Sequence, residues 1–482
     1  MNSSKLTDRV QFLGSKIEAQ ERGCLEALNL IGSIKSLAFK PICLPDLFYK
    51  RDTEAPASLV AATENTIIPT LTAPSLGCSM GVIKTSLFKN EITEEFAKNF
   101  YSYIQEETEK SYGFLENMLV WLGLKNRRLK KYDLTISQFE DIIKYGAKSA
   151  IKRYNLPESI LEKLDNEGSL FTEKELNNLN LHEILPRSSF TNGRHNIGYG
   201  FKGNHFLEIQ FVEDILDENT AELWGVKKNQ VMVMYHGGGG MVAYHIGRYF
   251  ANRRKNTFKQ KFFLNIGKAL FHFGSLEGLK NFRKRFGYYF KPGLFQEIPI
   301  DSPEGKRLML ATKASLNYSY SFSLAITRRI IDALKKSLPS KHIETELIAL
   351  KIHNSIMKEK IKGKEVILHR HTANKVEEGK PVIVAGYNNT NSYIAVGLPG
   401  ADNLLSSSDH GSGFIIKLFQ KKGISRKHPD GYHTLLFKSK PPYKIKVEHI
   451  TSEGVDYVVE NLYKAGIIKP VLKLRPIAVF KG

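Results

Sequence analysis

The sequence predicts a mixed α+β fold with a β-rich core and helical insertions, and three observations support that class. Apolar runs typical of strands occur in both halves of the chain, and helical patterns fill the middle. No internal repeat and no Pro/Gly/Ser-rich linker divides the 482 residues, which are numerous enough to bury a large core. We therefore predict one large domain over residues 1–482 rather than tandem units.

The helical elements follow from apolar side chains that recur every three or four residues. Residues 1–40 are predicted to form polar helix and turn, and residues 91–190 a helical insertion. Within the insertion, Thr172 and Glu175 have the spacing of a capping box and predict a helix start. Long helices are predicted for two later stretches, 308–337 and 343–361.

Strands are predicted where short apolar runs rich in Val, Ile and Tyr are bounded by turn residues. These runs are 206–211, 231–235, 365–368, 382–384, 393–396, 444–447 and 477–479. They lie on both sides of the predicted long helices, which favours a single mixed domain over separate units.

The charge is strongly positive, with 70 Lys and Arg against 49 Asp and Glu, a net charge of +21. Such a balance makes a polyanion a reasonable partner without identifying it. The segment 246–291 holds twelve Lys/Arg, twelve Phe/Tyr and one acid, Glu277. It predicts a basic, aromatic helical pair whose rings are mostly core and whose cations form a track for phosphates. The acidic stretch 157–183 is not expected to contact nucleic acid.

Cysteine usage and hydropathy bear on the compartment. Only three cysteines occur, without C-x-x-C spacing, which favours a reducing environment, and Cys24 and Cys43 are expected to be core thiols. The first residues lack the apolar core of a signal peptide, and no apolar run is long enough to span a membrane. We expect a cytoplasmic protein with no membrane partner.

Histidines carry the most suggestive chemistry. Five of the fourteen lie at Gly or Asn turns beside a predicted strand or helix end: His195, His205, His236, His353 and His410. Each alone is more often structural, but His236 precedes four glycines whose N–H groups could cradle phosphate. Cys78 lies in a tight turn of small residues, where it is either a metal ligand or a small buried hydrophobe.

Two further histidines receive the ordinary interpretation. His371 is expected at a solvent-facing strand end, and His245 would face the same site as His236 only if the glycine loop closes tightly. No P-loop, dinucleotide-binding glycine motif, nucleophile elbow or zinc-finger spacing is present in the sequence.

The sequence landmarks as a set resemble the RtcB-type RNA-splicing ligases, from about Leu44 to the C-terminal Lys481-Gly482. The most distinctive are Gly203-Asn204-His205-Phe206-Leu207-Glu208 and the terminal Lys-Gly. The others, in order, are Leu44-Pro45-Asp46, Ile67-Ile68-Pro69, Leu76-Gly77-Cys78-Ser79-Met80, 231–236, 314–318, His353-Asn354, His369-Arg370, Ser392-Tyr393, 410–413 and 474–477. The resemblance implies the mixed α+β fold of that family.

The resemblance also implies an activity and roles for individual residues. Members join RNA ends bearing a 3′-phosphate or 2′,3′-cyclic phosphate to a 5′-hydroxyl, using GTP and two Mn²⁺ ions, and act in tRNA splicing and RNA repair. It places Cys78, His205, His236 and His353 as metal ligands and His410 as the nucleophile that carries GMP. It implies guanylate contacts for Asn204, Glu208, His353, Asn354, Gly386, Tyr387, Ser392, His410, Gly411, Ser412, Gly413 and Lys481. An archease-like activator is a further implied partner.

The chain departs from the family pattern at five positions. An aspartate ligand is Ser75, and two anion-binding arginines are Gly240 and Phe414. A histidine is replaced by Phe48, and a small serine by Tyr387. One thiolate and three imidazoles form a softer ligand set than Mn²⁺ usually has, so one metal, or a softer one such as Zn²⁺, is an alternative.

Three functions therefore stay open at the level of the sequence. The first is a divergent, GTP- and metal-dependent RNA ligase, which the retained His410, Cys78 and Lys481 favour. The second is a relative that binds RNA ends or nucleotide without ligation. The third is a metal-dependent hydrolase of cyclic phosphates, which would need only the metal ligands.

Overall fold

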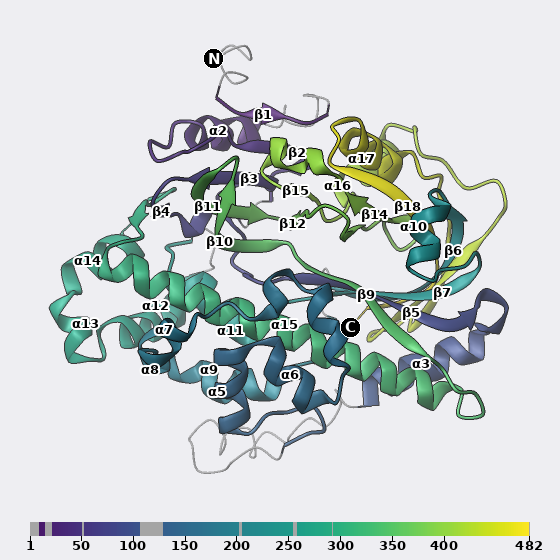
Figure 1. Cartoon of the computed structure of the whole chain (residues 1–482), viewed down its shortest axis with the longest axis horizontal. Coiled ribbons are helices and arrows are strands. Elements are labelled where there is room, and N and C mark those ends of the chain that lie inside the picture. Colours follow the sequence, from purple (N-terminus) through teal and green to yellow (C-terminus); the bar gives the residue numbers. More distant parts are fainter. Residues whose placement is uncertain are drawn as a thin grey trace.

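Two β-sheets and a set of helices build the molecule, here described from a computed structural model (Figure 1). The structure describes residues 9–14, 22–50, 53–106, 129–201, 205–253, 258–291 and 293–481. The predicted mixed α+β class is confirmed, while the extent of a single domain stays a prediction.

The larger sheet has nine strands and carries most of the residues singled out above. Its order is β13 (Pro381–Val384), β14 (Ser392–Gly397), β18 (Ile468–Lys481), β6 (Phe206–Ile215), β7 (Gln230–Gly237), β5 (Ser79–Phe88) and β9 (Thr345–Ile352), with β16 (His433–Lys438) and β17 (Lys444–Glu448) attached through β18. Its pairs are antiparallel except β16 with β18. Strands from positions 79 to 481 thus meet in one sheet, and the predicted strands other than 365–368 belong to it.

A second, five-stranded sheet lies beside the first. Its order is β1 (Gln11–Phe12), β2 (Ile42–Phe48), β3 (Ala57–Thr63), β11 (Lys364–His371) and β10 (Asn354–Ile361). Two short pairs complete the strands: β12 (Ala373–Lys375) with β15 (Ser407–Asp409), and β4 (Thr66–Ile67) with β8 (Ile298–Pro299). The chain passes directly from β9 in the larger sheet to β10 in the smaller one through His353.

The helix predicted over 343–361 is wrong, because these residues form β9 and β10. Both faces of β9 are buried, so its sequence lacks the apolar–polar alternation of a half-exposed strand. Isoleucines recurring every four or five residues in this stretch imitated helical spacing. Alternation is visible only at the end of β10, where burial switches at each residue from 357 to 360.

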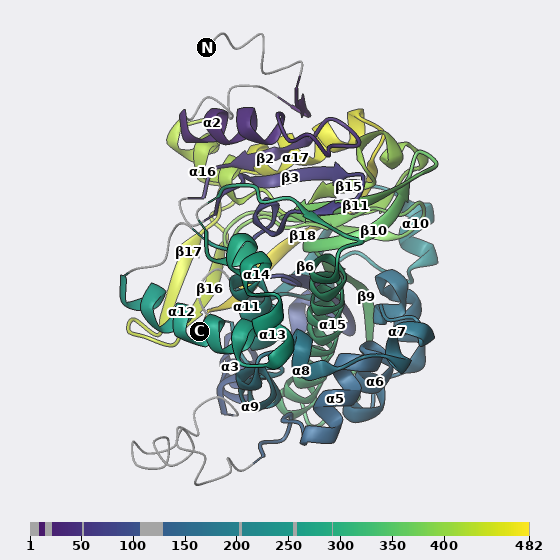
Figure 2. The ribbon, with the colours of Figure 1, turned by 90° about the vertical axis from the view of Figure 1, so that its left-hand side faces the viewer.

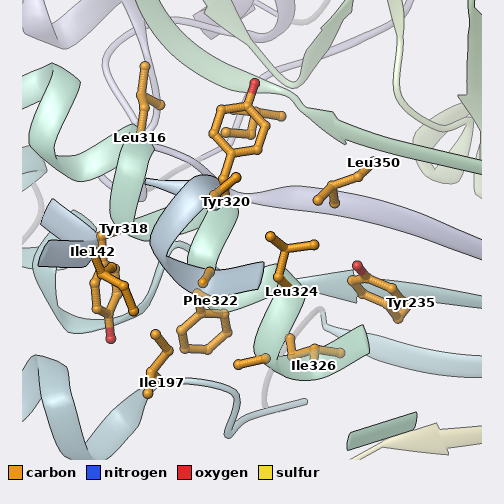
Figure 3. Close-up of a cluster of buried hydrophobic side chains, with 14 of the residues drawn as sticks. Ile142, Ile197, Tyr235, Leu316, Tyr318, Tyr320, Phe322, Leu324, Ile326 and Leu350 are labelled. Carbon is orange, nitrogen blue, oxygen red and sulfur yellow. The ribbon is translucent and has the colours of Figure 1, made fainter. Parts of the chain in front are cut away.

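The 35-residue helix α15 (Pro303–Ser337) confirms the other long prediction and organises the core. Figure 1 shows α15 running below the larger sheet, with the helices of the insertion beneath it. Figure 3 shows its side chains between Ile142 and Ile197 on one side and Tyr235 and Leu350 on the other. Packing on two sides explains why nearly every position of α15 is buried. The helix includes several serines, and the hydroxyls of Ser319 and Ser321 donate to carbonyls one turn earlier.

The helical insertion is confirmed within the described residues. Its helices are α3 (Glu94–Glu106), α5 (Ile136–Tyr145), α6 (Ala147–Tyr154), α7 (Glu173–Asn177), α8 (Leu181–Ile184) and α9 (Arg187–Asn196), with 3₁₀ turns η3 (Lys89–Glu91), η4 (Glu158–Lys163) and η5 (Asp165–Gly168). Helix α7 begins with the predicted capping box of Thr172 and Glu175.

The remaining helices surround the sheets. They are α2 (Arg22–Ile31), α10 (Glu218–Leu223), α11 (Gly240–Tyr249), α12 (Phe258–Phe273), α13 (Leu276–Lys280), α14 (Phe282–Tyr289), α16 (Gly413–Lys421) and α17 (Glu453–Lys464), with 3₁₀ turns η2 (Pro69–Leu71) and η6 (Pro399–Leu404). Among the described residues, no helix is long and apolar enough to cross a membrane.

Helices α12–α14 carry most of the basic, aromatic segment and lie at the left-hand side of Figure 1, which faces the viewer in Figure 2. The prediction for this segment is only partly right. Arg253, Lys268 and Arg285 are buried and bind internal acceptors such as Glu54 and Glu304, so they are not available to phosphate. Exposed cations do occur there, at Lys280, Arg283, Lys284 and Lys291. The aromatics divide likewise, with Tyr249, Phe250 and Tyr289 buried and Phe262, Phe282 and Phe286 exposed.

Candidate metal and nucleotide site

The site is built where strands of the larger sheet begin or end. Cys78 directly precedes β5, His205 precedes β6, and His236 lies near the end of β7. His236 is the register partner of both Met80 and Phe206, which brings the three segments together. His353 joins them because it follows β9, the other neighbour of β5.

These side chains converge on one point. The Cys78 Sγ lies 3.2 Å from His236 Nε2 and 3.5 Å from His205 Nε2. His236 Nε2 lies 3.3 Å from His353 Nε2. The ligand atoms of Cys78, His236 and His353 all lie within 4.8 Å of one another, and the three residues are buried.

Burial determines the protonation of this cluster. It lowers the pKa of His205 to about 4, and together with the neighbouring His410 and His236 it lowers that of His353 well below the usual value. The imidazoles of His205 and His353 are therefore neutral and keep a lone pair at neutral pH. Burial raises the pKa of Cys78 to about 12, so without a cation the thiol holds its proton. A donor set of neutral imidazoles and one thiol that a metal can deprotonate fits a transition metal.

His410 stands beside the cluster in an orientation that suits a nucleophile. Its ring stacks on His353 with centroids 4.2 Å apart, and its Nδ1 lies 2.9 Å from the carbonyl oxygen of Thr372. Because a carbonyl only accepts, Nδ1 carries the proton and Nε2 has the free lone pair. Burial lowers the pKa of His410 to about 3, with a further contribution from Lys50, so the ring is neutral.

The predicted guanylate residues form a second cluster. Glu208 is buried and accepts a hydrogen bond from Gln210, which also donates to Ser392. Burial raises the pKa of Glu208 to about 7, against the opposing effects of the Gln210 hydrogen bond and the charge of Lys481. The Lys481 Nζ lies 5.3 Å from the centre of the Tyr387 ring. This arrangement offers a carboxylate, an aromatic face and a cation together.

The remaining predicted contacts hold the loops that carry His410. Asn354 accepts a hydrogen bond from the N–H of Thr372, the residue whose carbonyl orients His410. Ser412 donates from its hydroxyl and its N–H to the carbonyl of Ala385, and Gly411 and Gly413 lie on either side of it. Gly386 donates its N–H to Ser392. Asn204 lies outside the described residues.

The departures from the family pattern have clear structural settings. Ser75 is exposed, unlike the buried cysteine three residues later. Gly240 has φ +65°, and a Cβ there would approach the rings of Tyr318 and Phe322 to 2.7 and 2.9 Å. Phe48 and Phe414 stack on each other with ring centroids 5.4 Å apart. Two departures distant in sequence are thus one packed pair.

Three histidine predictions need comment. His195 lies on α9 and contacts Asp133 at 2.8 Å, and His245 is buried against Ser189, so their contacts are structural. The solvent-facing interpretation of His371 is wrong, because it is completely buried at the end of β11, where β3 and β10 flank it. The prediction of core thiols is confirmed, since Cys24 and Cys43 are buried.

Two residues at this site were not identified from the sequence. The charge of Lys50 acts on Cys78, His353 and His410, and Gln210 links Glu208 to Ser392. Their only sequence signals were closeness to landmarks: Lys50 follows Asp46 by four residues, and Gln210 follows Glu208 by two.

The sequence of the chain is similar to those of known proteins. A family model described as tRNA-splicing ligase RtcB matches residues 31–482. A protein named tRNA-splicing ligase RtcB from Thermococcus kodakarensis is 23% identical to the chain, over 87% of the chain and 83% of its own length. One of the same name from Nanoarchaeum equitans is 26% identical, over 86% of the chain and 82% of its own length. One of the same name from Methanocaldococcus jannaschii is 24% identical over 84% of the chain, which spans only 40% of that relative.

Proposed function

The chain belongs to the tRNA-splicing ligase RtcB family, and from this premise we propose that it is a GTP- and metal-dependent RNA ligase. It would join an RNA end bearing a 3′-phosphate or 2′,3′-cyclic phosphate to a 5′-hydroxyl end. The observation that carries the proposal is the position of neutral His410, stacked on His353 beside Cys78 and His236.

His410 would supply the nucleophile. Its Nδ1–H donates to the Thr372 carbonyl, which maintains one tautomer and leaves the lone pair on Nε2. Attack by Nε2 on the α-phosphorus of GTP forms a P–N bond and releases pyrophosphate. His410 would then pass the guanylate to the RNA 3′-phosphate, and the 5′-hydroxyl would displace GMP.

Cys78, His236 and His353 would hold a divalent metal, with His205 contributing beside Cys78. Such an ion offsets negative charge on phosphate groups. The donors are one sulfur and imidazole nitrogens, and Ser75 faces solvent, so the set favours Zn²⁺ or one Mn²⁺ over a pair of Mn²⁺ ions.

Glu208, Tyr387, Ser392 and Lys481 would receive the guanine nucleotide. A buried carboxylate can accept two parallel N–H groups from one edge of guanine, and the Tyr387 ring offers a stacking face. Exposed Lys280, Arg283, Lys284 and Lys291 supply positive charge for an RNA backbone on the α13–α14 side. Dependence on an archease-like activator and action on tRNA belong to the same proposal.

A binding protein without ligase activity is the second candidate, and specific observations favour it. Gly240 and Phe414 replace arginines that glycine and phenylalanine cannot imitate as bidentate phosphate donors. A hydrolase of cyclic phosphates is a third candidate, because it would need only the Cys78 cluster.

Labelling with [α-³²P]GTP separates these candidates. The protein is incubated with GTP and Mn²⁺ or Zn²⁺, denatured and separated by electrophoresis, alongside His410→Ala and the matched exposed-histidine control His433→Ala. A ligase gives a covalent label that is lost only in His410→Ala. No label with any divalent metal would refute ligation through His410. Opening of the 2′,3′-cyclic phosphate of an RNA to a 3′-monophosphate end under those conditions would then support the hydrolase.

A further inference from the structure

Helices α12–α14 expose an unusual number of large apolar side chains. Seven of the eighteen that are exposed among the described residues lie between positions 262 and 286, on these three helices. The most exposed of the seven are Leu276 at 81%, Leu270 at 69% and Leu279 at 58%. Single exposed apolar residues are ordinary, but a cluster of them marks a surface that a partner covers.

Helix α12 is amphipathic in the reverse of the usual sense. Its polar side chains Lys268 and His272 are buried, and both donate hydrogen bonds to backbone carbonyls of neighbouring segments. Ile266 and Leu270 each precede one of these residues by two positions, which is about 200° around an α-helix. They therefore lie on the opposite face of α12, and both are exposed. Internal carbonyls thus hold α12 by its polar face and leave its apolar face in solvent.

Ring contacts join the three helices into one projecting unit. Phe273 at the end of α12 contacts Phe282 of α14 with ring centroids 4.7 Å apart, and Phe282 stacks on Phe286 at 5.7 Å. Helix α13, with Leu276 and Leu279, lies between α12 and α14 in the chain. Figure 1 shows α13 at the left-hand edge of the molecule, and Figure 2 shows it facing the viewer. The two leucines thus belong to the part of the chain that projects furthest on this side.

Positive charge borders these leucines. Lys280 directly follows Leu279, and Arg283 lies three residues further along the chain; both cations are exposed. Among residues 258–289 the sequence has one acid, Glu277. The surface therefore combines exposed aliphatic side chains with an excess of cations. A complementary partner offers an apolar interior behind an anionic surface.

We propose that α12–α14 form a docking surface for an anionic lipid bilayer, a partner beyond the proposed ligase activity. Leu270, Leu276 and Leu279 enter the boundary between headgroups and acyl chains, and Lys280 and Arg283 lie among the anionic headgroups. The sequence-based expectation of no membrane partner rested on the lack of a spanning segment, which a protein that lies on the membrane surface does not require.

Three other occupants fit this surface less well. RNA phosphates match the cations, but leucine side chains offer no flat ring on which a base can stack. A second copy of the chain would bring Lys280 and Arg283 of both molecules together, where like charges repel. A partner helix usually lies in a groove, whereas α13 lies at the projecting edge of the molecule (Figure 1). A bilayer is broad, anionic at its surface and apolar inside, which suits a projecting apolar tip bordered by cations.

The test is co-sedimentation of the full chain with vesicles of equal parts phosphatidylcholine and phosphatidylserine, and with vesicles of phosphatidylcholine alone. The variants are Leu276→Ala and the double variant Leu276→Ala/Leu279→Ala. Leu223→Ala is the matched control, because Leu223 is 85% exposed on α10, outside this surface. The unaltered protein should bind the mixed vesicles, and should bind more weakly to the neutral vesicles or at high salt. Truncating one inserted leucine should weaken binding about tenfold and truncating both about 100-fold, whereas Leu223→Ala should bind as the unaltered protein does.

A second measurement reports insertion directly. In Leu276→Trp, the fluorescence of the new indole should shift to shorter wavelength when mixed vesicles are added, because the ring leaves water for the membrane interface. Leu223→Trp should show no such shift. Urea denaturation of each variant checks that the fold is retained, as expected for exposed positions.

Several outcomes would overturn the proposal. One is the absence of binding to mixed vesicles, and another is equal binding by the double variant. Loss of RNA binding in the double variant, with vesicle binding unchanged, would assign the surface to RNA. Without vesicle binding, dimers that dissociate in the double variant would assign it to a second copy, and binding of an acidic amphipathic model peptide through Leu276 to a partner helix. Labelling of His410 by GTP is measured separately, so failure of the ligase would leave this test intact.

Discussion

Gly240 offers a quantitative test of why the site lacks an arginine at this position. Its φ of +65° is a left-handed conformation, and an added Cβ would lie 2.7 Å from Tyr318 Cε1 and 2.9 Å from Phe322 Cδ2. Neither ring can easily retreat, because both are buried and the Tyr318 hydroxyl donates to the Gly193 carbonyl at 2.6 Å. Any side chain at position 240 should therefore destabilise the fold before it can reach a phosphate.

The magnitude follows from two separable costs. A left-handed φ costs a residue with a Cβ about 1–2 kcal/mol, partly offset by about 0.4–1 kcal/mol from the reduced entropy of the unfolded chain. Overpacking against two fixed rings adds about 1–3 kcal/mol. Gly423 is a matched control, since its φ is +68° and a Cβ there would meet nothing within 4 Å. We expect a loss of about 2–4 kcal/mol for Gly240→Ala and about 1 kcal/mol or less for Gly423→Ala.

Urea denaturation of the two variants measures the difference directly, because the backbone cost is common to both. Gly240→Arg should be at least as unstable as Gly240→Ala and should not improve labelling of His410. A difference between the two alanine variants below about 0.5 kcal/mol would refute the steric argument. The absence of the arginine would then need a functional explanation instead.

Three other results are expected. Burial raises the pKa of Cys78 to about 12, so Zn²⁺ binding should release the thiol proton. The apparent affinity for Zn²⁺ should therefore rise about tenfold per pH unit from pH 6 to 8. Calorimetry in two buffers counts the released proton, and Cys78→Ala should abolish the dependence of the Zn²⁺ affinity on pH. Burial lowers the pKa of His369 to about 4, whereas in the unfolded chain this side chain binds a proton below about pH 6.5. Its contribution to stability is therefore present above pH 6.5 and lost as the pH falls toward 4. Other buried histidines add to the same slope, so urea titrations between these pH values should show a slope smaller by about 1 kcal/mol per pH unit in His369→Gln than in the unaltered protein. Arg253→Met breaks a buried ion pair with Glu54 and should lower the free energy of unfolding in urea by about 3–5 kcal/mol. Lys284 is exposed, so Lys284→Met should leave the free energy of unfolding unchanged and alter only the salt dependence of RNA binding.

The sequence predicted those parts of the fold whose local pattern agrees with their environment. The strands around Ile209, Val233 and Ile394 are apolar runs bounded by turns, and they form the larger sheet. The stretch 343–361 failed because its first half is buried on both faces, so the period of two was absent from its apolar residues. Burial on two faces is a property of the assembled sheets, and no window of the sequence contains it.

The same distinction applies to charge. The sequence predicts surface cations in the segment 246–291, because most lysines and arginines are exposed. Three of them are instead buried: Arg253, Lys268 and Arg285. The structure encloses them with carbonyls and carboxylates from other elements, such as Thr72 and Glu304, which a sequence window cannot reveal. The Cys78–His236 cluster was predicted through the family resemblance, and the fold accounts for it, because antiparallel pairing brings the start of β5 and the end of β7 together.

The departures from the family pattern acquire a common meaning only in three dimensions. In sequence, Phe48 and Phe414 are two separate losses of polar groups, but their rings are one stacked pair, so neither change leaves a polar partner stranded against an apolar neighbour. Lys50 lies against that pair and acts electrostatically on His410. The stacked pair therefore fills with one apolar contact two positions at which the family pattern has a histidine and an arginine.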